Sequence, residues 1–218
     1  MDKEQIIVTI PLVIVGLAAM TSLISFRYDY PDTLKKLSVL WVINFCFDLA
    51  GHIIYYSDAP NLWLYNIYFW IQFLALAWLY DKQIANKYVR RSIRLFLVVF
   101  PLLVAGDSMV SGIGDLQTIV IVAGGVFMIF LAASYFRQLY LSEETETITR
   151  DPWLWFSCGI LIQFGGTTPY LGMMNYLNKQ YPEFSHYYYL YGSNSFTTLL
   201  NFLIIVGYLC RRNYQKSR

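Results

Sequence analysis

The residues best suited to chemistry lie in one apolar stretch, residues 37–56. Asn44, Asp48 and His52 follow one another there at intervals of four residues. In an α-helix this spacing keeps three side chains within about 80° of arc, so that they form one stripe. A carboxyl group and an imidazole on the same face can bind a cation or pass a proton between them.

The depth of Asp48 in its stretch makes it the strongest candidate. It is the only acidic residue well inside any apolar stretch of the chain. Counted from Leu37 it lies about 17 Å deep, and His52 lies about 6 Å beyond it. Because a charged, unpaired carboxylate is costly in hydrocarbon, we expect Asp48 to be neutral at rest. It would ionise when a cationic ligand, a proton acceptor or water enters.

Other polar residues fall at two depths in neighbouring stretches. The first set shares the depth of Asp48, and the second lies nearer one end. The first set is Gln72, Gln163 and Asn201, and the second is His52, Asn66, Thr167, Thr168 and Asn194. We predict that they line one polar cavity together with Asn44 and Asp48. The alternative for each Asn, Gln and Thr is a hydrogen bond that holds two helices together. Within residues 165–169 the two glycines and the proline favour close backbone approach and a free carbonyl.

The elements that must position these residues are membrane-spanning helices. The chain is 57% hydrophobic and only 14% charged, far below the roughly 25% charged residues of soluble domains. This composition excludes a soluble enzyme, a disordered protein and a secreted disulfide scaffold, and the net charge of +2 argues against binding of nucleic acid. Apolar runs of about 20 residues predict an all-α, single-domain bundle of seven transmembrane helices over residues 1–218. The predicted spans are 6–26, 37–56, 62–80, 91–110, 116–135, 153–174 and 190–210.

The distribution of basic residues gives the bundle a direction. With seven spans, 14 of the 16 Lys and Arg residues fall on one side of the membrane. Cytoplasmic loops carry such an excess, so we expect the N-terminus outside and the C-terminus in the cytoplasm. The fourth span has the shortest uncharged run, and a re-entrant segment there would weaken the asymmetry. Seven full spans are therefore the preferred interpretation.

Aromatic residues concentrate where the two membrane interfaces should lie. Tyr187, Tyr188 and Tyr189 form an outer group, and Trp153 and Trp155 an inner one. These are typical of interfacial belts, although the tyrosine run could also stack on a ligand. The three cysteines match no metal-binding spacing, so we expect no disulfide framework, no metal site and no cofactor.

The chain resembles some known seven-helix proteins in outline. Helices 1–3 and 5–7 share an orientation, which favours a 3+1+3 pseudo-repeat. The last span has no Lys to hold retinal, and the Pro-Gln signature of small sugar transporters is absent. Asn66 in helix 3, the Asp-Pro-Trp-Leu-Trp segment at residues 151–155 and the Asn-containing last helix are similar to small seven-helix membrane proteins from Bacteroidota-like bacteria. That resemblance implies an integral protein of the bacterial inner membrane and supplies no chemistry.

Three functions fit these observations. The first is a receptor-like sensor that binds a small polar or amphipathic ligand in an outward-opening cavity and acts through a cytoplasmic or membrane partner. The second is a small-solute transporter, with Asp48 and His52 as a proton relay. The third is an intramembrane enzyme that uses the same pair as acid and base, which is less favoured because no nucleophile lies at matching depth. A purely structural subunit is the remaining alternative, and the sequence leaves the oligomeric state open.

Overall fold

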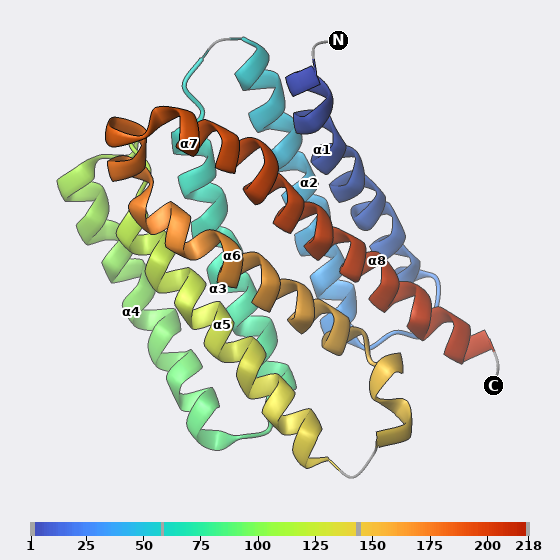
Figure 1. Ribbon diagram of the computed structural model, residues 1–218. Helices are drawn as coiled ribbons and strands as arrows, with labels where there is room; N and C mark the ends of the chain where they lie inside the picture. The colour runs from blue at the N-terminus through green and yellow to red at the C-terminus, as the bar shows by residue number, and fades with distance from the viewer. Residues whose placement is uncertain (1–2, 58, 143–144, 217–218) are drawn as a thin grey trace.

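The fold of the chain is entirely helical in the part that the structure describes. A computed structural model describes residues 3–57, 59–142 and 145–216, of which none forms a strand. Seven long helices run alternately up and down one bundle, and the first begins at the end opposite to that where the last one finishes (Figure 1). The all-α prediction is therefore confirmed.

The long helices differ from the predicted spans mainly at their ends. Helix α6 reaches further than predicted, and the last span is preceded by a short helix and a π-helical segment. The helices are α1 (Lys3–Ser22), α2 (Asp32–Tyr56), α3 (Leu62–Gln83), α4 (Lys87–Ser111), α5 (Thr118–Leu141), α6 (Pro152–Gln180), α7 (Pro182–Tyr187) and α8 (Asn194–Lys216). The shorter segments are the 3₁₀ turns η1 (Leu23–Phe26) and η2 (Thr145–Arg150) and the π-helix η3 (Tyr188–Ser193).

Six segments of the described chain are long and apolar enough to cross a membrane. The fourth, Lys87–Val110, is one of them, so the stretch predicted to be shortest forms a full-length helix. Helix α6 is not among the six, although it has 29 residues. Its Gln, Gly, Thr and Asn residues lower its hydropathy, and it packs between α5 and α8 along the bundle (Figure 1).

The helices form a ring in chain order. Helix α1 contacts α2, α2 contacts α3, α3 contacts α5, α5 contacts α6, α6 contacts α8, and α8 returns to α1. Helix α4 lies outside this ring, against α3 and α5 (Figure 1). The ring therefore brings α2, α3, α6 and α8, the helices with the predicted polar residues, around a common interior.

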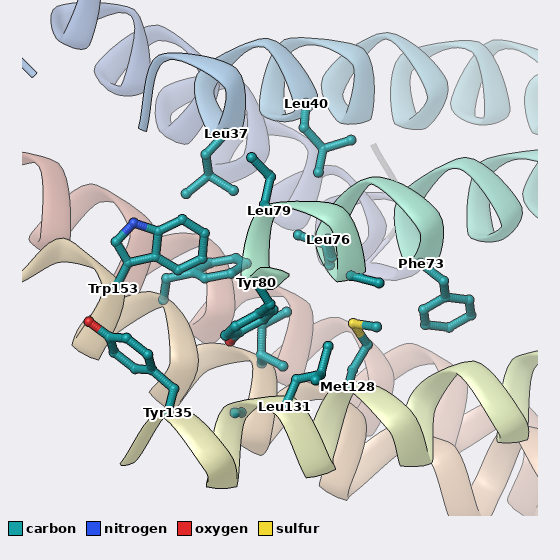
Figure 2. Packing of buried hydrophobic residues seen from close by; sticks show 14 of the residues in the cluster. Leu37, Leu40, Phe73, Leu76, Leu79, Tyr80, Met128, Leu131, Tyr135 and Trp153 are labelled. Carbon is teal, nitrogen blue, oxygen red and sulfur yellow. The ribbon is translucent and has the colours of Figure 1, made fainter. Parts of the chain in front are cut away.

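The core of the ring is aromatic near its inner end, which is the end where α8 finishes. Tyr80 lies 5.4 Å from Trp153 and 6.5 Å from Tyr135, measured between ring centroids (Figure 2). Trp153 is only 3% exposed, so its assignment to an interfacial belt is wrong. The Asp151 carboxylate accepts hydrogen bonds from the Trp153 backbone N–H and from the Tyr135 hydroxyl, which fixes the indole inside the bundle.

A buried polar network closes the ring at the same end. The Tyr208 hydroxyl of α8 donates to the Leu34 carbonyl of α2 at 2.9 Å and accepts from the Ser38 hydroxyl at 2.9 Å. The Tyr30 hydroxyl donates in turn to the Tyr208 carbonyl at 2.7 Å. Because these groups are buried, each bond removes a desolvation penalty, and together they hold the end of α8 against the start of α2.

Glycines allow α3, α5 and α6 to pack closely. A Cβ atom built on Gly124 of α5 would lie 2.4 Å from the Phe73 ring of α3. A Cβ atom on Gly125 would lie 2.3 Å from the Thr168 hydroxyl of α6. Helix α5 can therefore approach both neighbours only because these two positions carry no side chain.

Candidate functional site

The predicted stripe of α2 faces the interior in part. Asn44 is 6% exposed, and its side-chain oxygen Oδ1 has no hydrogen-bond partner among the described residues. Asp48 and His52, one and two turns further along, are half-buried. The His52 ring lies edge-on to the Tyr56 ring at 4.8 Å, so it borders the aromatic outer end of α2, the end where α8 begins.

Three tyrosines lie within electrostatic reach of Asp48. Tyr65 and Tyr68 come from α3, and Tyr189 comes from the π-helix η3. A Cβ atom added to Gly51 would lie 2.6 Å from the Tyr65 hydroxyl oxygen, so that hydroxyl lies directly against α2 beside Asp48. We call Asp48, Tyr65, Tyr68 and Tyr189 the Asp48 cluster. It joins three elements, α2, α3 and η3, around one carboxyl group.

Gln72 extends the Asp48 cluster toward the middle of α3. It is 6% exposed, and its side chain interacts with the Tyr68 hydroxyl. Tyr65, Tyr68 and Gln72 are spaced by three and four residues, so they occupy one face of α3. Gln72 therefore lies one turn from Tyr68, on the face of α3 that contributes to the Asp48 cluster.

Gln163 and Asn201 belong to a second set, formed around α8. The Trp41 indole N–H donates to Asn201 Oδ1 at 2.8 Å, and the Asn201 side-chain amide donates to the Thr197 carbonyl at 2.8 Å. The Gln163 amide donates to the Thr197 hydroxyl at 3.3 Å, and the Thr167 hydroxyl donates to the Gln163 carbonyl at 2.7 Å. This chain of bonds links α2, α8 and α6.

Two residues of the second predicted set, Asn66 and Asn194, form hydrogen bonds with backbone groups. Asn66 donates to the carbonyls of Ile113 and Asp115 at 3.0 and 2.8 Å and accepts from the Gln117 N–H at 3.2 Å, so it holds the connection between α4 and α5. Asn194 donates to the Leu190 carbonyl at 3.0 Å within its own helical unit. Both side chains thus bind backbone carbonyls, and their contact with a ligand stays a prediction.

The segment 165–169 of α6 is continuous helix with Pro169 inside it. The Gly166 carbonyl accepts a hydrogen bond from the Tyr188 hydroxyl, and a Cβ atom on Gly166 would meet the Phe196 ring at 2.5 Å. Gly166 is thus a packing position, whereas Gly165 has no neighbouring atom within 4 Å. Thr168 is 6% exposed, and its hydroxyl has no hydrogen-bond partner among the described residues.

The predicted residues therefore contribute to two groups, an electrostatic one around Asp48 and a hydrogen-bonded one around Asn201. Gln72 belongs with the Asp48 cluster, while Gln163, Thr167 and Asn201 belong with Trp41 and Thr197. That both groups line one polar cavity stays a prediction. Among the described residues, no group of three His, Cys, Asp or Glu side chains is placed to hold a metal ion.

Sequence reasoning did not connect any tyrosine with Asp48, although it named Tyr189 as part of a run that could stack on a ligand. The spacing of Tyr65, Tyr68 and Gln72 was a usable signal, because it marks one face of a helix. The position of Tyr189 relative to Asp48 carried no such signal, because the π-helical turn around Tyr189 changes the register that a regular helix would have.

The helical ring, with six described segments long and apolar enough to cross a membrane, is the architecture of a polytopic helical membrane protein. Comparison with known proteins found no matching family model, no similar curated protein and no similar solved structure. The likeness to small bacterial seven-helix proteins stays a prediction.

Proposed function

We propose that the protein is a membrane-embedded sensor that binds a small polar or amphipathic ligand with a positive charge at the Asp48 cluster. The observation that supports this proposal most directly is that Asp48 of α2 interacts electrostatically with tyrosines of two other elements. These are Tyr65 and Tyr68 of α3 and Tyr189 of η3. No Lys or Arg lies within α2 or α3 near this depth to neutralise an ionised Asp48. A cationic ligand would supply the missing charge.

The chemistry of the cluster suits an organic ammonium group. A carboxylate balances its charge, and the faces of tyrosine rings attract cations by about 0.5–2 kcal/mol per contact. Tyrosine hydroxyls can in addition accept hydrogen bonds from an N–H group. Binding would leave Asp48 ionised but paired, which removes the cost of a lone charge in the membrane.

The position of Tyr189 offers a route for the signal. Tyr189 lies in the π-helix η3, which continues directly into α8, and α8 finishes at the opposite end of the bundle (Figure 1). A π-helical turn holds one residue more than the α-helical path, so its loss rotates and shifts the chain that follows. A ligand that pulls Tyr189 toward Asp48 would favour one of these two states and move the inner end of α8.

The distribution of basic residues suggests how this site is oriented in the membrane. Asp48 lies about 24 Å along α2 from Asp32, in the half that the basic residues assign to the outside. The inner end of α8 would then meet a cytoplasmic or membrane partner. The protein would occupy the inner membrane of a bacterium, with seven spans including α6.

The test uses choline and its neutral isostere, 3,3-dimethylbutan-1-ol. We expect choline to raise the midpoint of thermal unfolding of the purified protein in nanodiscs in a saturable way, whereas the alcohol has no such effect. Asp48→Asn keeps the shape of the side chain and should abolish the shift. Asp115→Asn, an exposed acid in the connection between α4 and α5, is the matched control and should retain it.

Each remaining outcome has a defined meaning. Equal shifts with choline and with the alcohol would show an apolar pocket and contradict the proposal. Retention of the choline shift in the Asp48→Asn variant would place the site elsewhere. A saturable shift that also disappears in Tyr189→Leu would support the role of η3.

Transport is the second candidate function. It is favoured by buried polar atoms without partners on two helices, Asn44 Oδ1 on α2 and Gln163 Oε1 and Thr168 Oγ1 on α6. Unsatisfied groups of this kind often mark the place of bound water or solute. The ring order also allows two halves, α1–α3 and α5–α8, to rock against each other as a 3+1+3 pair. Accumulation of labelled choline in proteoliposomes, lost in Asp48→Asn, would establish transport in place of sensing.

A further inference from the structure

A basic hollow opens at the inner end of α4. It is lined by Lys87, Tyr88, Arg90, Arg91 and Arg94. Four of these five side chains are cationic, and all come from the first two turns of one helix. The Lys87 ammonium lies 5.2 Å from the centre of the Tyr88 ring, which borders the hollow. This concentration of positive charge plays no part in the Asp48 cluster.

The backbone beneath the hollow is firmly held. Asn86 caps α4, its side-chain oxygen accepting the N–H groups of Tyr88 and Val89. The Ala85 N–H donates to the Gln138 side chain of α5 at 2.7 Å, and Ile84 is 3% exposed. The cationic side chains therefore project from a fixed turn, which lowers the entropic cost of binding an anion.

The positive charge of the hollow is only partly balanced. Asp81 lies 3.4 Å from Arg90 and 3.9 Å from Arg94, measured from its Oδ1 to each Nε. Among the described residues it is the one acid paired with these cations, and the first turn of α4 contains no acidic residue. Four cations against one carboxylate leave a net positive charge. A helix N-terminus adds a partial positive charge of its own, so the cluster is unfavourable for α4 until an anion binds.

An exposed apolar stripe continues from the hollow along α4. Arg91 is followed by Leu95, Val98 and Leu102 at steps of four, three and four residues, which keeps them on one face. These three side chains are 63%, 65% and 68% exposed. From Leu95 to Leu102 the stripe extends about 10 Å along the helix axis, away from the basic end. A soluble anion would use the hollow alone, whereas a lipid would use both.

We infer that the hollow and stripe bind one anionic phospholipid. Its phosphate accepts charge-assisted hydrogen bonds from Arg91 and Arg94, and an acyl chain lies along Leu95, Val98 and Leu102. Arginine suits this role because its guanidinium presents two parallel N–H groups to a phosphate. The position of α4 outside the ring leaves this face open to lipid (Figure 1).

The test compares lipids of different charge in mixed micelles. We expect dioleoylphosphatidylglycerol to raise the midpoint of thermal unfolding in a saturable way, and dioleoylphosphatidylcholine to do so much less. The double variant Arg91→Gln/Arg94→Gln should weaken the apparent affinity for the anionic lipid at least about tenfold, because two charge-assisted contacts are lost. Arg91→Lys/Arg94→Lys keeps the charge and should retain part of the affinity.

Matched controls separate a site from a general attraction. Arg27→Gln/Arg137→Gln removes two exposed charges at the same end of the bundle and should leave the lipid effect unchanged. An equal loss in this control would show diffuse attraction and overturn the inference. Water-soluble glycerol 3-phosphate should not reproduce the shift; if it does, the hollow is a site for soluble phosphate rather than lipid. A lack of preference between the two lipids would also overturn it.

Discussion

At the scale of single residues, Trp41 and Asn201 form the clearest long-range contact. Trp41→Phe removes the indole donor and leaves the Asn201 oxygen buried without it. We expect the free energy of unfolding to fall by about 1–3 kcal/mol, the cost of an unsatisfied buried acceptor. Trp63→Phe, at a side chain that is 42% exposed, is the control and should change it by less than about 0.5 kcal/mol. Denaturation in detergent, followed by circular dichroism, measures both; equal effects would contradict the structural role.

The same pair shows what sequence can and cannot give. The interval of four residues placed Asn44, Asp48 and His52 on one face, because that depends only on helix geometry. The depth count placed Asn201 at the depth of Asp48 but could not find its partner. Trp41 lies 160 positions away in the chain, and only the closing of the ring brings the two together. The sequence thus predicted which residues share a face of one helix, but not which residues of different helices form hydrogen bonds with each other.

At the scale of elements, two glycines of neighbouring helices give opposite predictions. A methyl group on Gly124 would overlap the Phe73 ring, whereas one on Gly165 would meet no atom within 4 Å. Gly124→Ala should lower the free energy of unfolding by about 1–3 kcal/mol through overpacking. Gly165→Ala should leave it unchanged or raise it by up to about 1 kcal/mol through helix propensity. Unfolding curves of the two variants in the same detergent measure both free energies. If Gly165→Ala were as destabilising as Gly124→Ala, the open space beside Gly165 would not be what determines its tolerance of alanine.

The π-helix η3 makes a second prediction at this scale. Deleting Gly192 removes one residue from Tyr188–Ser193 and lets the segment adopt a regular α-helix. We expect helix content by circular dichroism to stay the same while the choline shift of unfolding is lost, because Tyr189 would turn away from Asp48. Gly192→Ala, which keeps the chain length, is the control. An unchanged choline shift after the deletion would remove η3 from the proposed signal path.

The predicted helix boundaries assumed that each helix begins and ends where its apolar run does. The predicted fourth span begins at residue 91, among basic residues. Helix α4 begins earlier, at Lys87, because Asn86 caps it and the basic side chains lie outside the ring. The prediction for the last span was wrong about its beginning. The tyrosine-rich segment before it is α7 and η3, helical although aromatic and polar. Capping and tertiary packing, rather than hydropathy, set these ends.

At the scale of the whole molecule, the number of membrane crossings is testable. Seven crossings predict that alkaline-phosphatase fusions in a bacterial host are active after Gly114 and Lys179 and inactive after Lys87 and Arg150. The pair Arg150 and Lys179 brackets α6, the long helix that is the least apolar. Different activities at these two points would establish that α6 spans. The same activity at both would reduce the bundle to six crossings and reverse the side on which α8 ends.

The contact between α1 and α8 has a consequence for the synthesis of the chain. The ribosome must add about 190 residues after α1 before α8 is complete, which takes about 10–40 s at ordinary elongation rates. During that interval Asn201, which accepts from the Trp41 indole, and Tyr208, one of several hydrogen-bond partners of Ser38, do not yet exist. The newly inserted helices α1 and α2 therefore remain in the membrane with a polar seam, formed by Ser38 and Trp41, that α8 does not yet cover. A membrane insertase that shelters this seam would determine the yield of folded protein, and a chain stopped before α8 would be a substrate for quality-control proteases.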